Sequence, residues 1–319
     1  MERIRNLRKQ LNKIDLPIYI SGHVTPDHDS IGSSLALGRL LEKTGHKVYV
    51  LIEDFDMDIT KLHHNTHLVA HDVGHDEYCF IAVDLNETYR LGRFKKSYQN
   101  AKITINIDHH QGNHTDADTI ISMPDTSSTS EIIYKLICVY GREYLDLDIA
   151  EDLYTGMMTD TSGFARRLSR ETLAIAQRLI NMGVDYETLI RGTFSHRTLY
   201  ELKALGQLIE EIHFDECLHY VSIDKSLEEF KHLTHNQITK TIAEELRKIE
   251  DMDVFFIFIM DNGSITGKCM SNISKNANII ANLFGGGGHK GEAGFTTTMS
   301  REEIIAKAKE FIKSQKAGK

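Results

Sequence analysis

The sequence has no tryptophan, only three prolines and four cysteines among its 319 residues. The cysteines form no CxxC pair, so neither a disulfide framework nor a cysteine-rich zinc site is indicated. The strongest apolar run, Val254–Met260, is too short to cross a bilayer. The charged N-terminus lacks the apolar segment of a secretory signal. These absences predict a cytoplasmic protein with no membrane partner.

An excess of positive charge is also missing, because the formal net charge is -9. Binding to long duplex DNA requires many contacts between Lys or Arg and phosphates, so this class of partner is excluded. Short single-stranded oligonucleotides or nucleotides remain compatible as substrates, since bound cations can reverse the local potential. The composition leaves homodimerisation open.

The chain length favours two domains, and the first half alternates short apolar strands with helices. This alternation predicts an α/β fold whose N-terminal domain has a mostly parallel sheet with helices on both faces. A smaller C-terminal α/β domain follows. We place the N-terminal domain at 1–192, a connecting helix at 193–212 and the C-terminal domain at 213–319. The expected strands include Pro17–Ile20, Val48–Ile52, Tyr78–Val83 and Ile103–Ile107, with a further one beginning at Ile120.

Carboxylates and imidazoles follow several of these strands or lie in loops. Because an open α/β sheet collects ligands in the crevice beyond the carboxyl ends of its strands, these side chains are expected to converge. Such a group could hold more than one divalent metal, which indicates metal-assisted hydrolysis. The segments concerned are His23-x3-Asp27-x-Asp29, Asp84, Asp108-His109-His110 and Asp160.

The mixture of Asp and His without thiolates favours two Mn²⁺ ions, with Co²⁺ or Mg²⁺ as substitutes. Two metals about 3.5–4 Å apart can hold one hydroxide between them and bind phosphoryl oxygens, so we expect hydroxide attack on phosphorus. The two ions need a carboxylate bridge, for which Asp84 is the best candidate. We expect Asp27 and Asp29 to lie in a loop, with a helix over Ile31–Thr44 opening near Gly32.

A second signal is the run Gly285–Gly288 followed by His289. Consecutive glycines cost backbone entropy, so a function is expected to require them. The amides of Gly286, Gly287 and Gly288 could approach a phosphate closely, and His289 could donate a hydrogen bond to it. A flexible turn is the alternative interpretation.

Two other patterns are interpreted as structural. Ser128-x-x-Glu131 matches a capping box, which we take as a helix start and nothing more. The histidine-rich segment His63–His75 is interpreted as a solvated region between strands rather than an extra metal site.

Taken together, these ordered motifs resemble the DHH phosphoesterase superfamily, first subfamily, whose C-terminal domain carries a GGGH motif. The resemblance covers essentially the whole chain. Within the superfamily it is greatest to the nanoRNase and 3′-phosphoadenosine-5′-phosphate phosphatase group and to the linear-dinucleotide phosphodiesterases. It implies a Mn-dependent phosphohydrolase of the oligoribonuclease or bisphosphonucleotide phosphatase type, acting on nanoRNA, dinucleotides such as pApA, or 3′-phosphoadenosine 5′-phosphate.

The resemblance also implies a role for each motif residue. One Mn²⁺ would be held by His23, Asp27 and Asp84, and the other by Asp29, Asp84, His109 and Asp160. His110 would contact substrate or support the nucleophile, and Asp108 would orient the ligands. The glycine loop with His289 would bring a terminal phosphate to the crevice.

The chain departs from the family pattern where an Arg-Ser pair usually precedes the GGGH loop. No arginine occurs in Ile265–Phe284, so Lys268 or Lys275 could substitute as point charges. Three arginines that follow the segment Thr159–Phe164 could also supply the phosphate contacts: Arg166, Arg167 and Arg170. Three alternatives stay open: a RecJ-like single-strand exonuclease, an inorganic pyrophosphatase, and a nucleotide-binding regulator with weakened catalysis. The exonuclease is disfavoured because the chain has no room for an added nucleic-acid-binding domain.

Overall fold

The computed structural model describes residues 1–53, 62–110, 112–194, 198–214, 218–224, 254–261, 264–271, 276–288 and 291–317, with residues 230, 233, 239, 242–243, 245–246 and 249. The chain divides into two compact units, Met1–His196 and Arg197–Lys319. Each unit has hydrophobic cores of its own. No helix in these described ranges is both long and apolar enough to cross a membrane.

The first unit contains a six-stranded sheet with the order β3-β2-β1-β4-β5-β6, and every pairing in it is parallel. The order reverses between β1 and β4, and ligands of such sheets bind beyond the carboxyl ends of the strands at this switch point. The strands are β1 (Ile18–Ser21), β2 (Val48–Leu51), β3 (Val69–Ala70), β4 (Cys79–Val83), β5 (Ile103–Asp108) and β6 (Thr119–Ser122).

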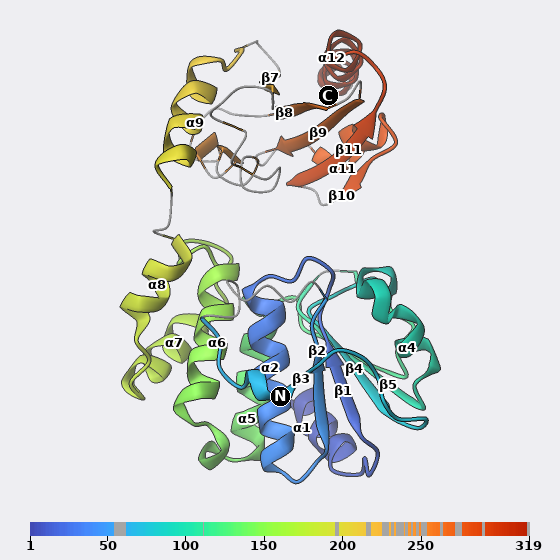
Figure 1. Ribbon diagram of the computed structural model, residues 1–319, viewed down its shortest axis with the longest axis vertical. Helices are drawn as coiled ribbons and strands as arrows, with labels where there is room; N and C mark the ends of the chain where they lie inside the picture. The colour runs from blue at the N-terminus through green and yellow to red at the C-terminus, as the bar shows by residue number, and fades with distance from the viewer. Residues whose placement is uncertain are drawn as a thin grey trace. The chain divides into compact units, whose positions relative to one another are not determined.

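Helices cover both faces of this sheet (Figure 1). One face packs its branched side chains against a large helical layer, and the other buries aromatic rings such as Phe80, Phe94 and Tyr98. The first layer contains α1 (Glu2–Leu11), α2 (His28–Lys43), α5 (Thr129–Tyr140), α6 (Leu147–Asp160), α7 (Thr172–Asn181) and α8 (Tyr186–Phe194). The second contains η2 (Thr88–Phe94) and α4 (Lys95–Asn100); η1 (Thr66–Leu68) and η3 (Arg142–Tyr144) are short connections.

The expected start of the second helix near Ile31 is wrong, because α2 begins at His28. Asp27 is its N-cap, and its Oδ1 accepts hydrogen bonds from the backbone N–H groups of Asp29 (3.1 Å) and Ser30 (3.0 Å). Asp29 therefore lies in the first helical turn rather than in a loop. Asp160 is likewise helical, as the last residue of α6. The strand expected from Ile120 is confirmed as β6.

The second unit is built on a five-stranded sheet with the order β10-β11-β9-β8-β7. Only β7 and β8 pair in parallel, and the other neighbours are antiparallel. The strands are β7 (His219–Asp224), β8 (Val254–Asp261), β9 (Ser264–Ser271), β10 (Gly287–Gly288) and β11 (Glu292–Thr297). The helices whose bounds the structure describes include α9 (Leu199–Glu210), α11 (Ala277–Asn282) and α12 (Arg301–Ala317).

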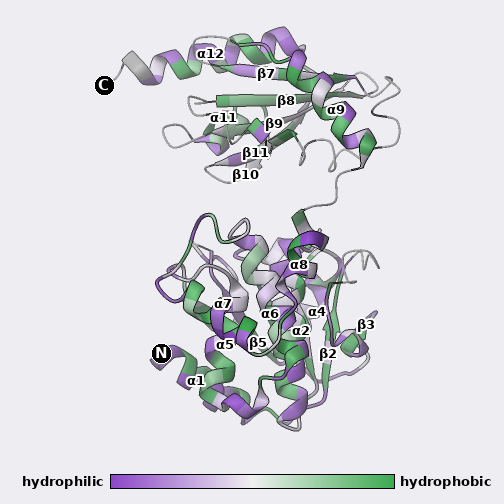
Figure 2. Ribbon diagram, turned by 90° about the vertical axis from the view of Figure 1, so that its left-hand side faces the viewer, coloured by the Kyte–Doolittle hydropathy of each residue, from purple (hydrophilic) through white to green (hydrophobic). Residues whose placement is uncertain are grey.

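Both faces of this second sheet are covered as well. Ala204, Leu205 and Leu208 of α9 pack on one face, and α11 and α12 pack on the other. The strand β8, which lies between β9 and β7, is hydrophobic along nearly its whole length, as Figure 2 shows. The structure thus confirms the predicted α/β class, with a parallel sheet flanked by helices and a second unit with its own sheet.

Candidate metal centre

The carboxyl ends of β1, β4 and β5 bring together the side chains that the sequence motifs single out. Three overlapping groups have ligand atoms within 4.8 Å of one another. The first two groups share Asp84, which directly follows β4, and the third is joined to them through His109. The groups are His23, Asp27 and Asp84; Asp84, His109 and His110; and Asp29, His109 and Asp160.

Asp84 lies at the centre of the arrangement. Its Oδ2 is 3.6 Å from His23 Nε2, and its Oδ1 is 3.5 Å from His109 Nε2. His109 Nε2 also lies 3.4 Å from Asp160 Oδ2. These separations exceed good hydrogen-bond lengths, and they match two ligands that each lie about 2.1 Å from a shared cation. The two oxygens of Asp84 therefore face two different groups of ligands.

The backbone at Asp84 is in the left-handed region, with φ 58°. Aspartate tolerates this conformation better than most residues, but it still stores strain. The amide of Asp84 donates to Ile107 O (3.0 Å), which ties the residue to β5. The turn directs a buried carboxylate, 2% exposed, toward His23 and His109.

Asp29 is held by the N-terminus of α5. Its Oδ2 accepts a hydrogen bond from the Thr129 N–H (2.7 Å), and its Oδ1 accepts one from the Ser130 N–H (2.9 Å). The Thr129 hydroxyl donates to Asp84 Oδ1 at 3.0 Å. The segment interpreted as only a helix start therefore positions two candidate ligands. Sequence reasoning missed this contribution because it depends on backbone groups about a hundred positions from Asp29.

Negative charge accumulates in this site. Burial, with the neighbouring Asp84 and Asp160 carboxylates, raises the pKa of Asp29 well above its ordinary value. Burial also raises the pKa of Asp160, although His109 and Arg167 oppose this shift. Burial alone would lower the pKa of His23, but the neighbouring Asp27 and Asp84 carboxylates raise it to about 10. Each shift shows that the cluster favours added positive charge.

A divalent cation fits these residues. Asp160 Oδ2 is buried and has no hydrogen-bond partner in the described part of the chain, which is costly unless a cation or donor satisfies it. Carboxylate oxygens and imidazole nitrogens are the donor set of hard to borderline metals. His23, Asp27 and Asp84 could hold one ion, and Asp29, Asp84, His109 and Asp160 a second.

His110 and Asp108 form a separate pair next to these ligands. His110 Nδ1 is 2.7 Å from Asp108 Oδ1, and the Asp108 side chain is fully buried. Burial alone would lower the pKa of His110, but the Asp108 hydrogen bond raises it. Asn113 Nδ2 donates to Asp108 Oδ2 (3.1 Å) and to Asn106 Oδ1 (2.7 Å). Asn113 thus supports the pair, and no sequence motif indicated it.

Arg166 and Lys268, two of the side chains predicted to bind phosphate, each contact another side chain of the protein. Arg166 Nε donates to Ser162 Oγ (2.8 Å). The neighbouring Arg167 contacts the candidate ligand Asp160 instead: its Nη2 donates to the backbone O of Asp160 (2.8 Å) and to Asp160 Oδ1 (3.3 Å). In the second unit, Lys268 Nζ pairs with Glu292 Oε1 at 2.6 Å. Of Arg166 and Arg167, it is therefore Arg167 that contacts a candidate metal ligand.

Two of the three glycine amides expected to approach a phosphate already donate within the protein. The Gly286 N–H donates to Ala281 O (3.1 Å), and the Gly288 N–H donates to Asn278 Oδ1 (2.9 Å). A Cβ on Gly286 would lie 2.1 Å from Gly294 O, so close packing on β11 requires glycine there. His289 lies outside the described residues.

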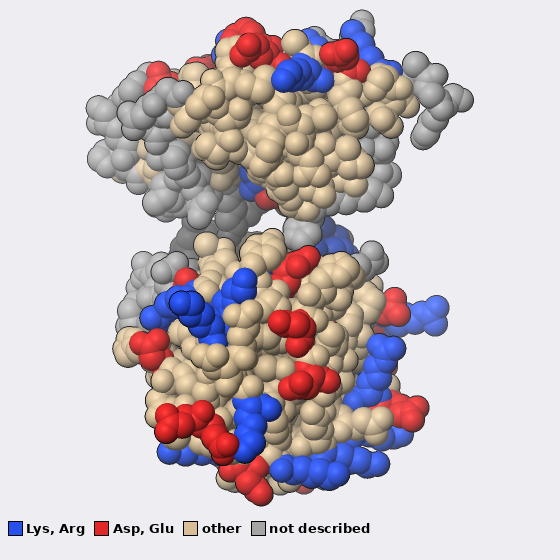
Figure 3. All heavy atoms as spheres, turned by 90° about the vertical axis from the view of Figure 1, so that its right-hand side faces the viewer, with Lys and Arg blue, Asp and Glu red and all other residues tan. Residues whose placement is uncertain are grey.

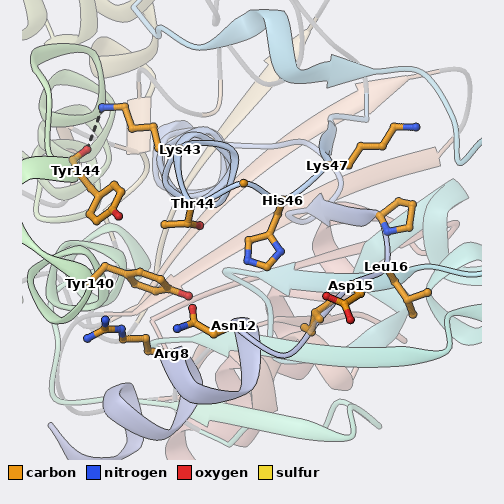
Figure 4. A pocket seen from close by; sticks show the side chains of 13 residues that line it. Arg8, Asn12, Asp15, Leu16, Lys43, Thr44, His46, Lys47, Tyr140 and Tyr144 are labelled. Atoms are coloured by element: carbon orange, nitrogen blue, oxygen red, sulfur yellow. Dashed lines mark hydrogen bonds between the residues drawn. The ribbon is translucent and has the colours of Figure 1, made fainter.

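A separate cavity of about 700 Å³ lies at the amino end of β1, away from these ligands. It is lined by helix ends and their connections, including Arg8, Lys43, His46 and Tyr140 (Figure 4). Arg8 donates to Val139 O (2.7 Å) and Lys43 to Tyr144 O (3.1 Å), so these cations satisfy carbonyls at chain turns.

Acidic and basic side chains are also interspersed on the face of unit 1 drawn in Figure 3, without one continuous basic patch.

Comparison with known proteins gives independent evidence. The chain is 27% identical to the bifunctional oligoribonuclease and PAP phosphatase NrnA of Thermus thermophilus, over 92% of this chain and 88% of that protein. It is 24% identical to the cyclic-di-AMP phosphodiesterase PdeA of Listeria monocytogenes, over 92% of this chain and 46% of that protein.

The solved structure of an exopolyphosphatase-related protein from Bacteroides fragilis has a similar fold. The TM-score is 0.85 at 24% identity, with 98% of this chain and 96% of that chain covered. The model of the DHH family, N-terminal domain, matches residues 17–159, and that of the DHHA1 domain matches residues 217–314. The chain therefore belongs to the DHH family, with a DHH domain followed by a DHHA1 domain as in its first subfamily.

Proposed function

We propose that this protein is a Mn²⁺-dependent phosphohydrolase of short nucleotides. The substrates would be oligoribonucleotides of a few residues, linear dinucleotides such as pApA, or 3′-phosphoadenosine 5′-phosphate. The observation that carries the proposal is the convergence of His23, Asp27, Asp29, Asp84, His109 and Asp160 at the switch point of a parallel sheet. The names of the NrnA and PdeA relatives support the same class of reaction.

When bound, two divalent cations would activate water and neutralise charge on a phosphoryl group. The chain's own residues supply the remaining functions. Asp84 offers one oxygen to each group of ligands. The amides at the start of α5 hold Asp29. These contacts orient the ligands before a cation arrives.

His110 is the candidate residue for contact with substrate. Its Nδ1 is engaged by Asp108, which orients the ring, and the raised pKa of His110 favours the protonated form that donates to phosphate oxygens. Arg167, and Arg166 beside it, are the candidate cations for a further phosphate. In the second unit, Gly287, His289 and Lys268 remain candidates for binding a phosphate.

The test is a hydrolysis assay with chromatographic analysis of the products. Purified protein is incubated with 3′-phosphoadenosine 5′-phosphate, pApA and RNA of two to five nucleotides, each with Mn²⁺, Co²⁺ or Mg²⁺. We expect release of mononucleotide or phosphate with Mn²⁺ and none with excess EDTA. Tight nucleotide binding without turnover in saturating Mn²⁺ would instead identify a regulator, and degradation of long single strands in preference to short ones would identify a RecJ-like exonuclease.

A further inference from the structure

A buried pair, His63 and Asp152, lies beside the metal-ligand loop but outside the candidate metal groups. Both side chains are fully buried. Asp152, from the middle of α6, lies 3.2 Å from His63 Nδ1 through its Oδ1. The same carboxylate accepts hydrogen bonds from the His64 N–H (2.8 Å) and from Asn65 Nδ2 (2.9 Å). The interpretation of this histidine-rich segment as solvated is therefore wrong for His63.

The pair continues to the first residue of α2. His63 Nε2 is 3.0 Å from His28 Nδ1, and the two rings lie 5.2 Å apart with a tilt of 33°. Burial lowers the pKa of His63 to about 3, so hydrogen bonds rather than charge hold this chain of side chains together. Asp152, His63 and His28 thus link the core of α6 to the start of α2.

His28 stands between two candidate ligands, Asp27 and Asp29. The positions of Asp27 and Asp29 depend on His28 to different degrees. Asp29 is buried, and amides of α5 hold both of its oxygens. Asp27 is 57% exposed, against 6% for His23 and 3% for Asp84 in the same group. The position of Asp27 is therefore set by the backbone at the start of α2.

Contacts of α2 with α6 show that this start is closely packed. A Cβ added to Gly32, one turn into α2, would lie 2.3 Å from Asp152 O and 3.3 Å from His63 Cε1. The preceding loop includes Thr25 with φ 50°, a strained conformation for a β-branched residue. A strained loop ending in an exposed ligand needs an anchor, and His28 provides one through His63.

We propose that His63 and Asp152 are positioning residues of the metal centre. They hold His28, and through it they hold Asp27 where it can share a cation with His23 and Asp84. The proposal rests on the proposed function, because it requires that Asp27 binds a metal. Groups that orient metal ligands from outside typically change metal affinity by about 10–100-fold when they are removed.

The experiment compares the full-length variants His63→Ala and His63→Gln with the wild type and a control. Glutamine keeps one donor and one acceptor. The matched control is His67→Ala. It removes a histidine of the same segment that is 55% exposed and whose Nε2 lies 3.4 Å from Glu42 Oε2. Mn²⁺ affinity is measured by titration calorimetry on metal-free protein, and circular dichroism reports folding and thermal stability.

We expect His63→Ala to weaken binding of one Mn²⁺ by about 10-fold or more. His63→Gln should recover most of this lost affinity, and the Mn²⁺ affinity of His67→Ala should stay within about twofold of the wild-type value. The Mn²⁺ concentration for half-maximal activity should rise in parallel, and kcat at saturating Mn²⁺ should recover. A purely structural role would lower the melting temperature without moving the Mn²⁺ affinity.

Wild-type Mn²⁺ affinity in folded His63→Ala would overturn the proposal. If that variant does not fold, Asp152→Asn is judged by the same measure. Asp152→Asn with weakened Mn²⁺ binding at intact stability supports the proposal, and an Asp152→Asn variant with wild-type Mn²⁺ affinity refutes it. Failure of the proposed function looks different, because the wild-type protein would then neither bind Mn²⁺ nor hydrolyse any nucleotide of the panel.

Discussion

Asp84 combines a left-handed backbone, a buried carboxylate and two oxygens that face different histidines. The Nε2 atoms of His23 and His109 both lie within 3.6 Å of the Asp84 carboxylate, so a change at Asp84 alters the surroundings of both histidines. Thr129 also donates a hydrogen bond to it. At the scale of single residues, we therefore expect a substitution of Asp84 to disturb the metal centre most.

The substitution Asp84→Asn keeps the shape of the side chain and removes its charge. Because one carboxylate serves both ligand groups, we expect nucleotide hydrolysis to fall by more than about 100-fold, beyond the effect usual for residues outside the ligand shell. Asp76→Asn, at an exposed aspartate of the same unit, is the matched control. Steady-state assays at saturating Mn²⁺ check this, and an Asp84→Asn enzyme as active as the control would contradict the assigned role.

The protons held by the metal-free site predict a second effect. The pKa of His23 is raised to about 10, against 6.5 normally, and that of Asp29 is raised above 3.8. Protonation of these groups stabilises the metal-free fold, and this contribution is lost as pH rises through the raised values. A bound cation must therefore displace protons.

We expect Mn²⁺ affinity to increase between pH 6 and pH 9, by about tenfold per pH unit for each proton displaced. Calorimetry in two buffers of different ionisation enthalpy counts the protons released. Equal apparent binding enthalpies in the two buffers, or an affinity independent of pH, would rule out this exchange.

At the scale of elements, the site is built where α2, α5 and α6 meet above the sheet. Glycine permits the closest of these approaches. A Cβ on Gly156 of α6 would lie 2.1 Å from Ser130 Oγ and 2.8 Å from Asp29 Oδ1. The spacing of the three helices and the position of Asp29 are therefore linked.

Gly156→Ala should destabilise the first unit by about 1–3 kcal/mol through overpacking, and it should weaken Mn²⁺ binding because Asp29 must move. The control is Gly206→Ala in α9, where a Cβ meets nothing within 4 Å. That change should stabilise its helix by about 0.5–1 kcal/mol. Thermal unfolding distinguishes the two changes, and a Gly156→Ala variant as stable as wild type would contradict the packing argument.

Glu131 shows a different way of joining elements. Its buried carboxylate accepts hydrogen bonds from Ser127, Ser169 and Thr172 and pairs with Lys135. It therefore ties the start of α5 to Ser169 and to the start of α7. Although burial alone would raise the pKa of Glu131, the Lys135 and serine contacts lower it, so the carboxylate stays charged.

At the scale of the whole molecule, the chain consists of two units with separate cores, and all candidate metal ligands belong to the first. A ligand stabilises the part of a protein that binds it in the native state. Mn²⁺ should therefore stabilise Met1–His196, by about 2.7 kcal/mol at a concentration 100 times its Kd.

Hydrogen exchange followed by mass spectrometry, with Mn²⁺ or with EDTA, tests this expectation. Peptides from β1, β4, β5 and the start of α5 should gain protection with Mn²⁺, and those from β8, β9 and α12 should stay unchanged. Gains spread equally over both units, or confined to the second, would contradict a metal centre in the first.

Much of this architecture follows from local patterns. Runs such as Val48–Ile52 and Tyr78–Val83 are apolar throughout because parallel strands are buried on both faces, and Ile103–Ile107 alternates isoleucine with polar residues, so their positions were predictable. The residues just after them, including Asp84 and Asp108, were predictable as candidate ligands because strand ends of such sheets share one edge. The start of α2 was not, because the apolar periodicity begins only at Ile31, while Asp27 caps the helix earlier through hydrogen bonds.

The sequence alone determined the α/β class, the two-unit organisation and the six candidate metal ligands, because hydrophobic periodicity and residue chemistry are local properties. Only the tertiary structure decided that amides of Thr129 and Ser130 hold Asp29, that Asn113 supports Asp108, and that His63 is buried against Asp152. Those contacts join segments that pair only after the chain has folded. Their geometry comes from the packing of helices on the sheet, which no window of neighbouring residues specifies.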